Sequence, residues 1–183
     1  MSELKTLTFS DSETGLFTSA QIRHLMKIEF ARARRYRLPL SFVVLNVDRL
    51  NDLARSFGYK AKELVLERFH VVLRREARSC DFTGRFMDDR VILVLPHTDS
   101  RGAKNLVSRI RRTMSAQEFN FEGKAFRVTV SAGICQYREK NTLFFDSLRD
   151  AAEEAANRAS TTGDTIVTLE PEEASKDPKP ATE

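Results

Sequence analysis

Acidic residues follow the apolar runs of this sequence at two places where carboxylates could bind a metal ion. Asp48 comes directly after a long apolar run, and Asp88 and Asp89 lie between two shorter ones. Hard divalent ions such as Mg²⁺ take carboxylate oxygens as ligands. Short polar residues also suit a hairpin turn, and Asp48 could instead cap a short helix. We therefore expect at most a single weak Mg²⁺ site, formed by Asp48 and Asp89.

The cysteines and histidines have none of the spacings of metal or redox sites. Cys80 and Cys135 lie far apart without a CxxC motif, which favours reduced structural thiols. His24, His70 and His97 are isolated and lack the pairing of zinc ligands. We expect no cofactor from these residues.

Length and composition are those of a globular domain. The chain has 183 residues, of which 41% are hydrophobic and 31% charged, with 7 Gly and 5 Pro. These values exclude collagen-like, disordered and disulfide-scaffold classes. No apolar run approaches the roughly 20 residues that a bilayer crossing needs, and the opening residues lack a signal-peptide pattern. We expect a cytoplasmic protein without a membrane partner.

The net charge of +4 is unevenly distributed. Residues 170–183 contain five acids and two lysines but no aromatic residue, which predicts a disordered tail after a basic domain. Basic stretches occur at residues 32–37, 73–78 and 109–112. Such stretches are usually solvated helix faces, and no recognition motif accompanies them, so nucleic-acid binding is not expected.

The hydrophobic periodicity predicts an alternation of helices and strands that would position these residues. Thr18 opens an amphipathic helix with a capping box, and Leu40 to Val47 reads as a strand buried on both faces. The further elements are helices at 50–57, 60–77, 100–115 and 148–160, and strands at 80–86, 91–95, 126–134 and 165–169. The core order is βαββαβ, which predicts an α/β (α+β) class, ferredoxin-like, palm-type fold with a mainly antiparallel central sheet covered by helices.

Several segments together resemble the GGDEF family, the bacterial diguanylate cyclases that make cyclic di-GMP from two GTP. They are DSETGL (11–16), ARARRYRLPLSFVVLNVD (31–48), DRLNDLARSFGYKAKEL (48–64), DFTGRFMDDRVILVLP (81–96) and TVSAGI (129–134). Their order and spacing are those of the family. The resemblance implies one GGDEF domain over residues 11–169, after a lead-in of residues 1–10.

The signature of that family is altered in this chain. Where the family has the five residues of its name, the chain has Met87, Asp88, Asp89, Arg90 and Val91. A Met lacks the backbone freedom of a Gly, and Arg90 places a cation where the family has Glu. The third-position acid, Asp89, is retained.

Other positions that the resemblance marks as functional are also changed. Asn46 stands for a metal-binding Asp, whereas Asp48 is retained. Ala54 replaces a base-reading Asn, and Glu63 replaces an Asp conservatively. Further replacements are Asn51, Asn157 and Ser160. Because phosphoryl transfer between nucleotides needs metal ions and positioned charges, these changes favour a degenerate domain that is not an enzyme.

An RxxD motif five residues before the signature matches the family's inhibitory site for cyclic di-GMP. Here it consists of Arg78 and Asp81, and Arg109 lies where the family supplies a second arginine. A guanidinium group can bind phosphate or the O6/N7 edge of guanine, and a carboxylate can accept from guanine N–H groups. The residues could instead form a surface salt bridge. The RxxD pattern also occurs at 49–52 and 85–88. Only the distance of Arg78 and Asp81 from the signature therefore favours them as the inhibitory site.

These observations predict a catalytically inactive cyclic di-GMP receptor that signals to an unidentified protein partner. The alternative is a ligand-independent scaffold in which the same fold binds a partner protein or forms a homodimer. The sequence leaves both hypotheses open.

Overall fold

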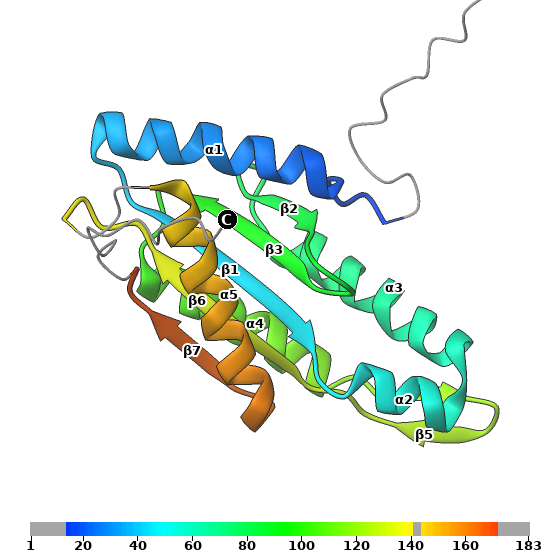
Figure 1. Ribbon diagram of the computed structural model, residues 1–183. Helices are drawn as coiled ribbons and strands as arrows, with labels where there is room; N and C mark the ends of the chain where they lie inside the picture. The colour runs from blue at the N-terminus through cyan, green and yellow to red at the C-terminus, as the bar shows by residue number, and fades with distance from the viewer. Residues whose placement is uncertain (1–13, 141–143, 172–183) are drawn as a thin grey trace, which may run out of the picture.

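The computed structural model describes residues 14–140 and 144–171, which form a five-stranded sheet with helices on both faces (Figure 1). The strand order is β2-β3-β1-β6-β7, and β4 and β5 form a separate two-stranded sheet. The helices are α1 (Ser19–Tyr36), α2 (Leu50–Phe57), α3 (Tyr59–Glu76), α4 (Ser100–Ser115) and α5 (Phe145–Thr162). The strands are β1 (Leu40–Val47), β2 (Phe82–Arg85), β3 (Val91–Pro96), β4 (Phe119–Phe121), β5 (Lys124–Phe126), β6 (Val130–Gln136) and β7 (Ile166–Leu169).

Strand β1 is the central strand of the large sheet. It pairs antiparallel with β3 on one side and with β6 on the other, so Leu45 lies opposite both Val91 and Ala132. All of its residues are buried except Asn46, which is half-buried near its end. Strand β2 pairs antiparallel with β3, and β7 joins β6 in parallel. The order β1, α3, β2, β3, α4, β6 confirms the predicted ferredoxin-like fold.

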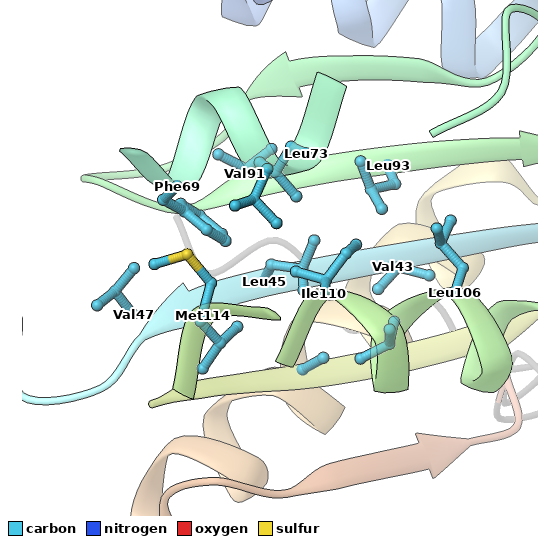
Figure 2. Close-up of a cluster of buried hydrophobic side chains, with 14 of the residues drawn as sticks. Val43, Leu45, Val47, Phe69, Leu73, Val91, Leu93, Leu106, Ile110 and Met114 are labelled. Atoms are coloured by element: carbon cyan, nitrogen blue, oxygen red, sulfur yellow. The ribbon is translucent and has the colours of Figure 1, made fainter. Parts of the chain in front are cut away.

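One face of the sheet packs against α3 and α4. Because side chains alternate along a strand, Val43, Leu45 and Val47 all point to this face. They meet Phe69 of α3 and Ile110 of α4 in a cluster of fully buried side chains (Figure 2). This packing fixes α3 and α4 relative to the sheet.

The opposite face packs against α1 and α5 (Figure 1). Phe42 and Val44 of β1 lie in this cluster with Met26 of α1 and Ala152 of α5. Helix α1 lies mainly over β2 and β3, whereas α5 lies over β1, β6 and β7. Phe30 of α1 and Phe145 of α5 are in edge contact, with ring centroids 6.3 Å apart.

Helix α5 approaches strand β6 closely at Gly133. A Cβ placed at this glycine would lie 2.0 Å from the backbone N of Ala156 and 2.4 Å from the carbonyl O of Ala152. Real Cβ atoms do not come this close to other atoms, so only glycine allows the observed separation of helix and strand.

The predicted helix boundaries follow from local chemistry. The side-chain oxygen of Thr18 accepts a hydrogen bond from the Gln21 backbone N–H at 3.3 Å, which confirms the predicted N-cap. Gly58 has φ +86°, a conformation that suits glycine, and it separates α2 from α3.

The predicted strand at 126–134 was wrong at its start. Phe126 ends the hairpin β4–β5, which no prediction covered, and β6 begins only at Val130. Glu122 and Gly123 both have positive φ values, +50° and +78°, as a tight two-residue hairpin turn requires. Phe126 packs on Phe57 with ring centroids 4.7 Å apart, so the hairpin lies against α2.

The predicted lead-in, residues 1–10, and residues 172–183 of the predicted tail lie outside the described residues. Within the described part of the chain, every helix is too short or too polar to cross a membrane.

Candidate functional site

The turn between β2 and β3 carries the altered signature. The Phe86 N–H donates to the Arg90 carbonyl at 2.9 Å, and the Arg90 N–H donates to the Met87 carbonyl at 3.1 Å. Asp88 adopts φ +54°, the left-handed conformation that Asp tolerates better than most residues. Asp88 is therefore the signature residue with positive φ, and the Met87 side chain is exposed to solvent.

A polar cavity of about 240 Å³ lies beside this turn; we call it the hairpin pocket. It is formed by the signature turn, the end of β1 and the start of α2. Its lining residues are Asn46, Val47, Arg49, Leu50, Asn51, Asp52, Asp88, Asp89 and Arg90. The fold thus brings together residues that the sequence separates by more than 40 positions.

Each of two signature residues contacts a neighbouring helix. Asp89 forms an ion pair with Lys62 of α3 at 2.6 Å, and the Lys62 side chain is only 12% exposed. The guanidinium of Arg90 donates to the Asn157 Oδ1 of α5 at 2.7 Å. The turn is therefore fixed between α3 and α5.

Asn46, near the end of β1, and Asp48, directly after the strand, also form hydrogen bonds. The Asn46 amide donates to the Ser160 hydroxyl at 3.2 Å. The Asp48 Oδ2 accepts from the Thr129 hydroxyl at 2.7 Å and from the Asp164 backbone N–H at 2.8 Å. Its other oxygen, Oδ1, is buried without a hydrogen-bond partner.

These residues do not fit the pair of metal ions that the resemblance implies. Asp89 is neutralised by Lys62, Asn46 has no charge, and one oxygen of Asp48 already accepts two hydrogen bonds. Within residues 14–140 and 144–171, no group of three or more His, Cys, Asp or Glu side chains is arranged to hold a metal ion. The predicted joint site of Asp48 and Asp89 gains no support, since Asp89 lines the hairpin pocket and Asp48 is absent from the described lining.

The two remaining positions of the predicted catalytic region lie on α2 and α3. Ala54 is half-buried in α2 and Glu63 is exposed in α3. The Ala54 carbonyl accepts from the Gly58 N–H at 2.9 Å at the junction of the two helices. Both residues lie outside the described lining of the hairpin pocket.

The RxxD residues lie together at another place, where α3 ends and β2 begins. The Asp81 carboxylate accepts from the Arg78 backbone N–H at 2.8 Å, and the Asp81 N–H donates to the Arg78 carbonyl at 3.0 Å. Arg109 of α4 donates to the Glu76 carboxylate at 3.1 Å and to the Glu76 carbonyl at 3.2 Å. We call Arg78, Asp81 and Arg109 the RxxD patch.

The structure contains a second cavity, of about 350 Å³, that the sequence patterns did not predict. It lies between α1, the signature turn and α5, with Ile22, Met26, Phe86 and Met87 among its lining residues. Its apolar residues read as core positions in the sequence, and only the unusual Met87 could have indicated it.

The family comparison identifies the class of protein. The family model described as "Diguanylate cyclase, GGDEF domain" matches residues 8–165. Since this match spans most of the sequence, the chain belongs to the GGDEF family. The resemblance inferred from the separate motifs is confirmed.

Curated relatives match most of this chain at 25–29% identity. Diguanylate cyclase DgcP of Pseudomonas aeruginosa is 29% identical over 154 residues, covering 84% of this chain and 23% of that protein. Diguanylate cyclase A of Treponema denticola is 25% identical over 141 residues, covering 74% of this chain and 38% of that protein. The chain thus spans well under half the length of these two relatives.

Solved GGDEF structures share the fold. The GGDEF domain of DgcB from Caulobacter crescentus, in complex with c-di-GMP, has a TM-score of 0.82 at 16% identity, covering 88% of this chain and 95% of that chain. Diguanylate cyclase SiaD of Pseudomonas aeruginosa, in complex with its activator SiaC, has a TM-score of 0.80 at 23% identity, covering 88% and 62%. At these identities the likeness shows the fold alone.

The relatives overturn the expectation that the chain is not an enzyme. DgcP, diguanylate cyclase A and DgcS of Shewanella oneidensis are named as diguanylate cyclases, so the chain belongs to a family that contains enzymes. The expectation rests on replaced residues such as Asn46, Met87 and Arg90. Counting replacements does not measure the transition-state stabilisation that a site retains, and the acids Asp48 and Asp89 are still present.

Proposed function

We propose that this GGDEF domain binds cyclic di-GMP at the RxxD patch and thereby acts as a receptor that signals to a protein partner. The single observation that carries the proposal is the position of Arg109. Although it is 31 residues away from Arg78 in the sequence, it contacts Glu76, the last residue of α3. Two guanidinium groups and one carboxylate from separate segments therefore belong to one surface.

The chemistry of the patch suits a dianionic dinucleotide. The guanidinium groups of Arg78 and Arg109 can each donate two parallel hydrogen bonds to a phosphate or to the O6/N7 edge of guanine. The Asp81 Oδ2 is held by the Arg78 backbone N–H, which positions the carboxylate to accept from guanine N–H groups. The complex of the DgcB GGDEF domain with c-di-GMP supports this class of ligand.

Glu76 competes with the ligand for Arg109. Its carboxylate is mostly covered, with a side chain 13% exposed, and it accepts from Arg109 and from Arg75. A bound phosphate has to share or displace this contact. The affinity for cyclic di-GMP should therefore be limited by Glu76.

Titration calorimetry with cyclic di-GMP tests the proposal. A charge-assisted hydrogen bond contributes about 1.5–3 kcal/mol, so Arg78→Ala should weaken binding about tenfold or more. Glu76→Gln should tighten binding, because it removes the negative charge that competes with the ligand for Arg109. Arg101→Ala, an exposed arginine in the first turn of α4, is the matched control and should bind like the wild type.

Equal binding by the wild type and Arg78→Ala would refute the RxxD patch as the site. An absence of any binding to the wild type would favour the alternative function, a ligand-independent scaffold for a partner protein. The complex of SiaD with its activator SiaC supports only the part of that alternative that concerns a protein partner. Binding at the patch does not depend on turnover at the hairpin pocket.

A further inference from the structure

The second cavity, between α1, the signature turn and α5, has apolar walls and several charged lining residues. Its walls include Ile22 and Met26 of α1, both buried, and Phe86 and Met87 of the turn. Its volume of about 350 Å³ is that of a small-molecule site, and such sites are mostly apolar with a few polar groups. None of its described lining residues also lines the hairpin pocket.

Met87 is the residue of the altered signature that lines this cavity. The three signature residues after the methionine line the hairpin pocket instead, so the turn contributes to a cavity on each side. A glycine at position 87 would have no side chain to form this wall. The Met87 side chain is 52% exposed, and a ligand in the cavity would remove apolar surface of this side chain from water.

Arginines outnumber acids among the charged lining residues of the second cavity. Arg23, Arg85 and Arg149 line it, and Glu153 is the one acid in the described lining. Arg149 forms ion pairs with two acids of its own helix, which lie outside that lining. Arg23 is exposed on α1 and has no ion pair or hydrogen bond within residues 14–140 and 144–171. The Arg23 guanidinium is therefore available to a ligand.

We propose that the second cavity binds a small aromatic molecule that carries one anionic group, such as a carboxylate or a sulfonate. The aromatic body would contact Phe86 and the thioethers of Met26 and Met87, since both ring edges and sulfur atoms make favourable contacts with aromatic rings. The anionic group would accept from the Arg23 guanidinium, whose fork matches two oxygens. This inference concerns neither the RxxD patch nor the hairpin pocket, and it does not rest on the function proposed above.

Glu153 of α5 opposes the binding of an anion. Its side chain is half-buried and has no ion pair or hydrogen bond in the described part of the chain. Because like charges repel, Glu153→Gln should strengthen the binding of an anionic aromatic molecule, whereas Arg23→Gln should weaken it. A neutral molecule of similar shape should respond to neither substitution. The two charges therefore predict a dependence on ligand charge that is separate from the dependence on shape.

Fluorescence titration with anilinonaphthalene sulfonate, an aromatic anion, tests the proposal, and phenylnaphthylamine, which lacks the sulfonate, is the matched neutral probe. Arg23→Gln should weaken binding of the sulfonate about threefold to fivefold and Glu153→Gln should tighten it about twofold, with neither affecting the neutral probe. Met87→Ala should weaken both probes about threefold or more, because apolar contact is lost. Arg101→Gln makes the same change in net charge on α4 and should affect neither probe.

Circular dichroism checks that each variant folds, because loosened proteins bind such probes more strongly. No binding of either probe to the folded wild type would overturn the proposal, as would an effect of Arg23→Gln no larger than that of Arg101→Gln. Unchanged binding of both probes in Met87→Ala would overturn the assignment to this cavity. An affinity that falls as the protein concentration rises would show that a second copy covers the cavity, and would also overturn the proposal.

Discussion

Replacing Gly133 by Ala should strongly destabilise the fold, because β6 and α5 are too close to admit a Cβ. The added atom would lie 2.0 Å from the Ala156 backbone N, whereas ordinary van der Waals contact begins near 3.4 Å. Helix α5 would have to move by about 1 Å or more, since backbone atoms cannot rotate away as a flexible side chain can.

The expected magnitude follows from the cost of overpacking a core. Inserting one carbon into a well-packed core typically costs about 1–3 kcal/mol, and the obstacle here is helix backbone, so we expect about 3 kcal/mol or more. For a domain of this size, about 3 kcal/mol lowers Tm by about 6–12 °C. A small stabilisation opposes this loss, because Ala lowers the conformational entropy of the unfolded chain relative to Gly.

Urea unfolding followed by circular dichroism measures this loss. Gly102→Ala is the matched control, because its new Cβ would meet only side-chain atoms of Thr98 and Asp99, and Ala favours the helix. The control should change the free energy of unfolding by less than about 1 kcal/mol. A loss in Gly133→Ala no larger than in the control would refute the reasoning.

Two further predictions concern a helix cap and the thiols. Thr18→Ala should lower the free energy of unfolding by about 1 kcal/mol, and Thr18→Ser should restore it, because the side-chain oxygen caps α1; urea midpoints that do not move would contradict this role. In a thiol-reagent assay near neutral pH, the native protein should expose only Cys80 and the unfolded protein both cysteines. Burial raises the pKa of the Cys135 thiol from 9.0 to about 12, so its contribution to stability should be complete below pH 9 and decline as the pH rises toward about 12. Rapid native reaction of two thiols would contradict the burial.

The large elements of the fold could be predicted because their patterns are strong. The apolar run Leu40–Val47 and the helix Ser100–Ser115 have the bounds that the periodicity predicts. The β4–β5 hairpin has strands of only three residues, too short for alternation to decide. Its one clear signal was the pair Glu122 and Gly123, which suits a tight turn.

The candidate sites were less accessible to sequence reasoning. The motifs located Arg78, Asp89 and Arg90, but not the partners of these residues. Arg90 and Asn157 are 67 residues apart, and sequence spacing alone does not indicate that a guanidinium and an amide will meet. Residues at replaced family positions thus form hydrogen bonds with one another, Arg90 with Asn157 and Asn46 with Ser160. These pairs form only when α5 packs on the sheet, so the sequence alone does not predict them.

The hydrogen bonds of Asp48 tether the far edge of the sheet. Through Thr129 and Asp164 its carboxylate joins the end of β1 to the start of β6 and to the loop before β7, where Arg111 of α4 also binds the Asp164 carboxylate at 2.7 Å. An alanine variant of Asp48 would therefore loosen the loop before the outermost strand as well as remove an acid. Slow amide exchange in β7 would have to be preserved before any lost activity of that variant could be attributed to chemistry.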